Sequence, residues 1–138
     1  GFDVNEKLRK KINTEKDKID ILISIDDSSV FLVECKTVKD NGYNKFSAIS
    51  RQIRSYKMLL EKNNLNVAKI LVVTPDFSDD FISDCGDDFD LNISLIKASS
   101  LTAIYKACKE NLGKKVTAQM FMKDVLIQED RIIRALKK

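Results

Sequence analysis

The sequence predicts an α/β fold, with a mixed β-sheet core flanked by helices on both faces. Two observations predict this class. Short β-branched segments alternate with amphipathic helical segments along the second half of the chain, as they do when strands and helices form separate layers. The 138 residues, 43% of them hydrophobic and 33% charged, are enough for one ordinary globular core and too few for two. We therefore expect residues 1–138 to form a single domain.

The first half of the chain is expected to contain three strands and a helix. Alternating apolar side chains predict the first strand, which leads into a charged turn at residues 13–18. Turn-forming residues at 26–29 separate the next two strands, and apolar side chains at spacings of three and four follow a polar loop. In order, the expected elements are strands over 2–12, 19–25 and 30–36 and a helix over 47–62.

The second half alternates strands with helices. A short β-branched run ends at Pro75, which is typical of a buried strand, and Gly86 is expected to close the helix that follows. Ser99 or Ser100 can cap a later helix that stops before Gly113. The expected elements are strands over 68–74 and 92–96, helices over 77–85 and 101–112, and a helical tail over 117–138 that is broken near Asp130.

The chain contains no histidine. This absence excludes Ser-His-Asp and Cys-His catalysis, histidine-ligated zinc, and nucleases that use imidazole as the general base. Three widely separated cysteines do not form a disulfide framework and are typical of a reducing compartment. No apolar run could span a bilayer and no segment resembles a signal peptide, so we expect a cytoplasmic protein without membrane contact.

Charge is spread unevenly along the sequence. The net charge is +3, but seven aspartates crowd residues 76–90 without a Lys or Arg, so the remainder of the chain carries +10. A basic body with one acidic loop is compatible with binding a polyanion such as DNA. A solvated surface of mixed charge explains the same residues equally well.

The two strands of the expected hairpin, over 19–25 and 30–36, place their charged side chains on one face. If the loop is residues 26–28, Ile21 opposes Val33 and Asp20 opposes Glu34. This register gives one apolar face, made by Ile19, Ile21, Ile23, Phe31, Val33 and Cys35, and a second face that carries Asp20, Leu22, Leu32, Glu34 and Lys36. Opposed carboxylates repel each other, whereas a bound Mg²⁺ would convert the repulsion into coordination. The alternative is a solvent-facing salt bridge to Lys36.

These residues resemble the signature of the PD-(D/E)XK nuclease superfamily, which is an acidic residue on one strand and (D/E)-x-K on the next. Ile19 stands where the formal signature has a proline. The resemblance implies a restriction-endonuclease-like fold and Mg²⁺, or Mn²⁺ in its place, bound by Asp20, Glu34 and the backbone carbonyl of Cys35. Lys36 would be catalytic, either orienting or deprotonating the attacking water or stabilising charge on the phosphoryl oxygens.

A second element follows in the order expected for the superfamily. Residues 52–56, Gln-Ile-Arg-Ser-Tyr, resemble its QxxxY element, with Gln52 and Tyr56 on one helical face. Both could then reach a phosphate or Lys36, so Gln52 is a candidate catalytic residue and Tyr56 a candidate DNA contact. Arg51 and Arg54 are expected to contact the DNA backbone. A helix face packed on the sheet is the alternative for Gln52 and Tyr56.

The resemblance implies an Mg²⁺-dependent DNA endonuclease. Within the superfamily, the sequence most resembles the cleavage domains of type IIS restriction endonucleases. Its points of similarity are the loop at 41–44, the Arg-rich helix and the late strand and helix over 96–107. A recombination or repair nuclease, such as a resolvase or RecB-like exonuclease, and a catalytically degenerate DNA-binding module are the alternatives. Double-strand cleavage would need a homodimer or a partner subunit.

We expect the chain to be a fragment that lacks the superfamily's first helix and any recognition domain. Glu6 is then either a further acidic residue near the metal or an ordinary surface side chain.

Overall fold

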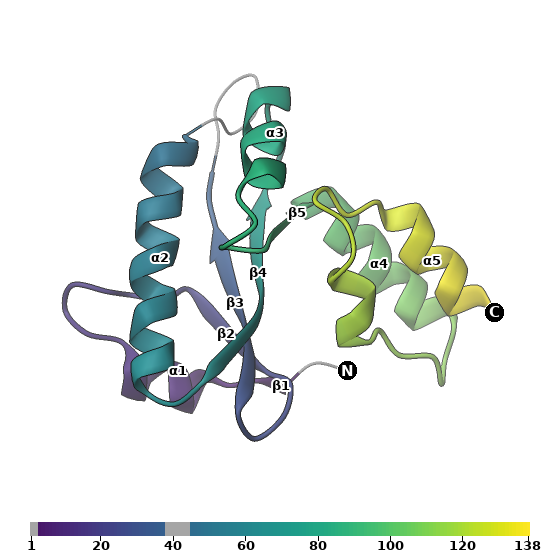
Figure 1. The fold of residues 1–138 in the computed structure, drawn as a ribbon. Coiled ribbons are helices and arrows are strands. Elements are labelled where there is room, and N and C mark those ends of the chain that lie inside the picture. The colour runs from purple at the N-terminus through teal and green to yellow at the C-terminus, as the bar shows by residue number, and fades with distance from the viewer. Residues whose placement is uncertain (1–2, 38–44) are drawn as a thin grey trace.

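The computed structural model describes residues 3–37 and 45–138 (Figure 1). Phe2 and the loop at 41–44 lie outside these residues. The helices, with one short 3-10 helix, are α1 (Glu6–Ile12), α2 (Phe46–Lys62), α3 (Asp79–Asp87), α4 (Ala98–Glu110), η1 (Ala118–Phe121) and α5 (Glu129–Lys137). The strands are β1 (Asp3–Val4), β2 (Ile21–Ser24), β3 (Ser29–Cys35), β4 (Asn66–Thr74) and β5 (Ile93–Lys97).

Within the described residues, five strands form one mixed sheet in the order β1-β2-β3-β4-β5. β1, β2 and β3 are antiparallel neighbours, whereas β3, β4 and β5 run parallel. The parallel strands are connected by α2 and α3, because parallel neighbours need a crossover to bring the chain back. The predicted α/β class with a mixed sheet is confirmed.

Helices cover both faces of the sheet (Figure 1). One core cluster joins α1, α2 and α3 to inward side chains such as Leu22, Leu32 and Val72. The other joins α4 and α5 to side chains of the opposite face, including Phe31, Val33 and Leu71. Because neighbouring residues of each strand fall into different clusters, the sheet is buried on both sides over its central strands.

The hairpin between β2 and β3 has the predicted register. Ile21 pairs with Val33 and Ile23 with Phe31, and the Ile25 N–H donates to the Ser29 carbonyl at 2.9 Å. The three-residue loop is stabilised by Asp26, whose Oδ1 accepts hydrogen bonds from the backbone N–H groups that follow it. The predicted alternation of faces therefore holds from Ile21 onward.

The prediction for Ile19 is wrong. Its side chain is buried with the α1–α3 cluster and not on the face of Ile21. The physical reason is that β2 begins only at Ile21, so Ile19 and Asp20 lie ahead of the strand ladder. Strand alternation does not extend to residues outside the ladder.

The first predicted strand is also wrong over most of its length. Only Asp3–Val4 pairs with β2, and Glu6–Ile12 is the helix α1. Leu8 and Ile12 are four residues apart, a spacing that fits a helix as well as a strand. Two interactions stabilise the helix over the strand. The Asn5 Oδ1 caps it by accepting from the Leu8 N–H at 3.0 Å, and Glu6 pairs with Arg9 at 2.7 Å.

Three helix boundaries differ from their predictions. α3 runs through Gly86 to Asp87, so the acidic stretch is largely helical and not a loop. α4 starts at Ala98, and Ser100 bonds Glu129 of α5 in place of capping. The tail is interrupted at 122–128 and not near Asp130, because backbone bonds at 125 and 127 attach this segment to Leu95 at the sheet edge.

None of the helices in the described part of the chain is both long enough and apolar enough to cross a membrane.

Candidate active site

Glu34 is the buried carboxyl group of the site. It lies near the end of β3, two residues after Leu32, which packs on the α2 side of the sheet. Side chains two apart on a strand share a face, so Glu34 also points toward α2. Only 2% of the residue is exposed, and its Oε2 has no hydrogen-bond partner among the described residues. Buried polar atoms normally have one, so Oε2 is an unsatisfied polar atom that a ligand could partner.

Asp20 contributes the second carboxyl group. It is exposed and directly precedes β2, one step beyond the pairing of Ile21 with Val33. Its Oδ2 accepts a hydrogen bond from the Cys35 N–H at 3.0 Å, which ties the start of β2 to the end of β3. The Asp20 carboxylate is near enough to Glu34 to raise the pKa of its carboxyl group. The structure thus brings together the two acids that the sequence register places opposite each other.

The neighbouring acid changes the proton affinity of Glu34. Burial first, then hydrogen bonding with Asp20 and repulsion by its charge, raise the pKa of Glu34 from 4.5 to about 8, and the positive charge of Lys36 opposes the rise. In the absence of a cation, Glu34 therefore holds its proton at neutral pH. A divalent ion between the two groups would allow both to ionise.

A chain of hydrogen bonds connects Lys36 to α2. The Lys36 Nζ donates to Oε1 of Gln52 at 2.9 Å, and Nε2 of Gln52 donates to the Tyr56 hydroxyl at 2.9 Å. The Tyr56 hydroxyl in turn donates to the Lys18 carbonyl at 2.8 Å. Gln52 and Tyr56, one helical turn apart, thus bridge the segments that carry Lys36 and Asp20. The predicted reach of Gln52 to Lys36 is confirmed.

A DNA contact stays a prediction for both arginines of α2. The Arg54 guanidinium pairs with Asp88 at 2.6 Å, beyond the end of α3. Arg51 is exposed on α2. Glu6 is bound to Arg9 within α1.

Sequence reasoning missed the residues that hold the segment before Asp20. Asn13 and Arg9 contact the backbone of Ile19, and the Ser55 hydroxyl donates to Asp17 at 3.0 Å. These are bonds between a side chain and a distant segment, and no periodic pattern signals them. The sequence predicts a strand over 2–12, so the position of Asn13 at the end of α1 could not have drawn attention to it either.

The residues fit a hard divalent cation. The described residues contain no group of three or more acidic or cysteine side chains gathered to hold a metal ion, so the protein side chains would supply two carboxylates. Mg²⁺ commonly binds through one or two carboxylates, with water and substrate phosphate as further ligands. The unpartnered Oε2 of Glu34 and the adjacent Asp20 match this requirement.

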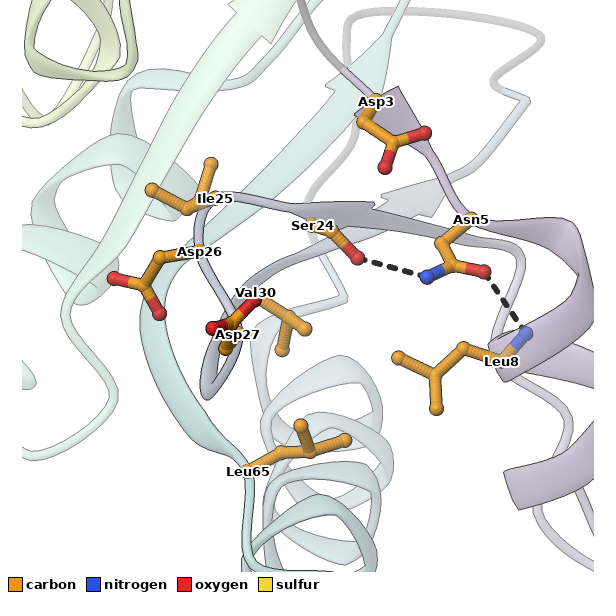
Figure 2. A pocket seen from close by; sticks show the side chains of 9 residues that line it. All are labelled: Asp3, Asn5, Leu8, Ser24, Ile25, Asp26, Asp27, Val30 and Leu65. Carbon is orange, nitrogen blue, oxygen red and sulfur yellow. Dashed lines mark hydrogen bonds between the residues drawn. The ribbon is translucent and has the colours of Figure 1, made fainter.

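A cavity of about 580 Å³ lies elsewhere, at the turn end of the hairpin (Figure 2). Its lining combines the carboxyl groups of Asp3, Asp26 and Asp27 with apolar side chains including Leu8 and Leu65. In Figure 2 the Asn5 side chain bonds both Ser24 and the Leu8 N–H, which joins α1 to β2 at this wall. None of its lining residues belongs to the Asp20–Glu34–Lys36 site.

No protein-family model, no curated protein and no solved structure matches this chain.

Proposed function

We propose that this protein is a divalent-metal-dependent nuclease that hydrolyses DNA phosphodiester bonds. One observation carries the proposal: a buried carboxyl group with an unpartnered oxygen lies beside a second carboxyl group, and a lysine from the same strand end is held next to them. The order of these residues along the chain, which resembles that of the PD-(D/E)XK superfamily, adds support.

Asp20 and Glu34 would hold the metal ion, with the backbone carbonyl of Cys35 as the third ligand that the resemblance implies. When bound, Mg²⁺ supplies Lewis acidity toward a phosphoryl oxygen and makes a coordinated water more acidic. The protein has to keep both carboxyl groups ionised and oriented. The hydrogen bond from the Cys35 N–H orients Asp20, and the packing of β3 against α2 fixes Glu34.

Lys36 would act on the scissile phosphate. One of its three N–H donors is used by Gln52, which leaves two for the attacking water or the phosphoryl oxygens. A fixed ammonium in a partly buried site stabilises negative charge as it develops in the transition state. Gln52 would keep Lys36 aimed at the same position as the two acids, because its amide is anchored by Tyr56.

DNA is the proposed substrate class. The chain outside residues 76–90 is strongly basic, and a polyanion binds such surfaces with release of counterions. Arg51 is an exposed cation on the helix that carries Gln52, so it remains a candidate for a backbone phosphate. Arg54 would first have to leave Asp88 to do the same.

A nicking assay tests the proposal. Supercoiled plasmid is incubated with the protein in Mg²⁺, in Mn²⁺ and in EDTA, alongside the Lys36→Ala variant. We expect nicked circles with either metal ion, none in EDTA, and a loss of at least about 100-fold in the variant. Nicking that survives EDTA, or that Lys36→Ala leaves unchanged, would contradict the proposed function.

The Gln52–Tyr56 pair favours a second candidate, a recombination or repair nuclease that acts at ends or branches. In this reading the same hydrogen-bond chain holds the same metal site. Closed circular, linear and branched DNA separate the two candidates. An exonuclease degrades the linear substrate and leaves closed circles intact, whereas an endonuclease converts the circles.

A further inference from the structure

Asp20 lies ahead of β2, so no strand ladder fixes the peptide that leads into it. The preceding residues, 17–19, are held instead by side chains from α1 and α2. A metal site tolerates only small displacements of its ligands, and groups outside the ligand set hold them in place. The contacts to residues 17–19 therefore bear directly on the site.

Asn13, at the C-terminal end of α1, binds both polar groups of the Ile19 backbone. Its Oδ1 accepts from the Ile19 N–H at 2.9 Å, and its Nδ2 donates to the Ile19 carbonyl at 3.2 Å. A neighbouring antiparallel strand would exchange the same pair of bonds with Ile19. One carboxamide thus takes the place of the strand that is missing at this position. The Ile19 side chain, 1% exposed, anchors the same residue in the core.

Arg9 makes a second contact from α1. Its Nη1 donates to the Ile19 carbonyl at 3.2 Å, while its Nη2 pairs with Glu6 at 2.7 Å. Glu6 therefore fixes the guanidinium over this carbonyl, within electrostatic reach of the Asp20 carboxylate. The Ile19 carbonyl accepts from both Asn13 and Arg9, which uses both of its lone pairs.

α2 holds the other end of the segment. The Tyr56 hydroxyl donates to the Lys18 carbonyl at 2.8 Å, and the Ser55 hydroxyl donates to Asp17 at 3.0 Å. Residues 17–19 are thus fixed between two helices, and Asp20 is the first residue beyond them. Rotation of the Ile19–Asp20 peptide would break the bonds to Asn13 and Arg9 and move the Asp20 carboxylate away from Glu34.

We propose that Asn13, supported by Arg9, is a positioning residue for the metal site: it holds the Ile19 peptide so that Asp20 meets Glu34 around one divalent ion. This inference rests on the proposed function. Neither residue touches the metal or the substrate. Their effect is transmitted through the backbone of Ile19.

The test measures Mn²⁺ binding to the full chain by calorimetric titration, in parallel with stability by urea unfolding. Asn13→Ala removes both bonds to Ile19. Asn5→Ala is the matched control, because Asn5 also makes two side-chain hydrogen bonds at the other end of the same helix, to Ser24 and Leu8. We expect Asn13→Ala to weaken Mn²⁺ binding by about 10- to 100-fold. Asn5→Ala should lose stability and keep the wild-type affinity.

Wild-type affinity in folded Asn13→Ala, or an equal loss of affinity in both variants, would overturn the inference. Should Asn13→Ala fail to fold, Arg9→Met decides: it removes one bond to Ile19 and leaves Asn13 in place, and the expected loss of affinity is about 3- to 10-fold. An unchanged affinity in Arg9→Met would then overturn the inference. Wild-type protein that binds no Mn²⁺ would overturn the proposed function and this inference together, whereas a metal-binding wild type with unaffected variants would leave the proposed function standing.

Discussion

At the scale of single residues, Glu34 occupies a position where most chains would place an apolar side chain. The four residues before it in β3 are buried and apolar. Burying an ionised carboxylate costs several kcal/mol unless a partner offsets the cost. The pKa of about 8 expresses that cost in the metal-free protein, since the carboxyl group keeps its proton and avoids the buried charge.

Glu34 should make metal-free stability depend on pH. The folded protein keeps this proton up to about pH 8, whereas the unfolded chain releases it near 4.5. Between these values the folded state binds more protons, so the free energy of unfolding falls as pH rises. At about 1.4 kcal/mol per pKa unit, the fall is expected to be roughly 2–5 kcal/mol. Glu34→Gln has no such proton and should lose this component.

Urea unfolding in EDTA between about pH 5 and pH 8, followed by circular dichroism, measures the difference. Wild type and Glu34→Gln are compared at each pH. Parallel curves for the two proteins would show that Glu34 titrates alike in the folded and unfolded states, contrary to this expectation.

Lys36 is expected to separate catalysis from metal binding. Lys36→Met removes the ammonium but neither carboxyl group, so Mn²⁺ affinity should stay within a few-fold of wild type while nicking falls by at least about 100-fold. Lys57→Met is the control. It removes a lysine of α2 that pairs with Glu61 at 3.8 Å and does not belong to the site. A parallel loss of metal affinity and nicking in Lys36→Met would instead assign Lys36 to the binding of the ion.

At the scale of elements, α2 connects the strand ends that carry the site. Its buried face, formed by Ile49, Ile53, Tyr56 and Leu60, packs on the sheet. Gln52 and Tyr56 reach from this helix to Lys36 and to the Lys18 carbonyl. Packing and hydrogen bonding to Lys36 are thus combined in one helix face. Tyr56 is buried and its hydroxyl is used by the Lys18 carbonyl, so the structure does not present it to DNA, and a contact of Gln52 with phosphate stays a prediction.

Tyr56→Phe tests this role of α2. The change keeps the buried ring and removes the hydroxyl that serves Gln52 and the Lys18 carbonyl. We expect a loss of about 1 kcal/mol in the free energy of unfolding, because one hydroxyl group loses its hydrogen bonds. Urea unfolding measures it, with Tyr105→Phe on the exposed face of α4 as control. Equal stability of the two variants would show that the hydroxyl contributes nothing.

The hairpin was predictable because burial enforces its alternation and three turn residues set its register. α1 was not, because the spacing of Leu8 and Ile12 suits both a helix and a strand, and only the cap at Asn5 resolves it. The same register placed Asp20 beside Glu34, whereas the contact of Gln52 with Lys36 was one of two possibilities that the resemblance to the QxxxY element suggested. Sequence reasoning could not find Asn13, because its bonds to Ile19 depend on how α1 turns back on the chain.

At the scale of the whole molecule, the sheet separates two groups of helices (Figure 1). The candidate site lies on the α1–α3 side, where Gln52 and Tyr56 of α2 bond Lys36 and the Lys18 carbonyl. Asp20, Glu34 and Lys36 come from two antiparallel strand ends, while the parallel strands provide the buried support behind them. The acidic residues of α3 and its flanks do not form a free negative surface throughout, because Asp88 pairs with Arg54 and Asp76 with Lys97.

One such site per chain should cut one DNA strand. Double-strand cleavage would then need a second copy or a partner subunit. At limiting protein concentration we expect nicked circles only, with linear product rising more steeply than first order as the protein is increased. Sedimentation with and without DNA should show a doubling of mass under the conditions that give linear product. Linear product formed by a strictly monomeric protein would contradict this expectation.

The central claim is that Asp20 and Glu34 jointly hold one divalent ion. Calorimetric titration of Mn²⁺ into the wild-type protein at about pH 8, and into Asp20→Asn and Glu34→Gln, tests it most directly. The account predicts one bound ion per chain in the wild type, with affinity reduced at least about 100-fold in either variant, and tighter wild-type binding as pH rises toward the pKa of Glu34. Absence of binding in the wild type, or undiminished binding in both variants, would contradict it.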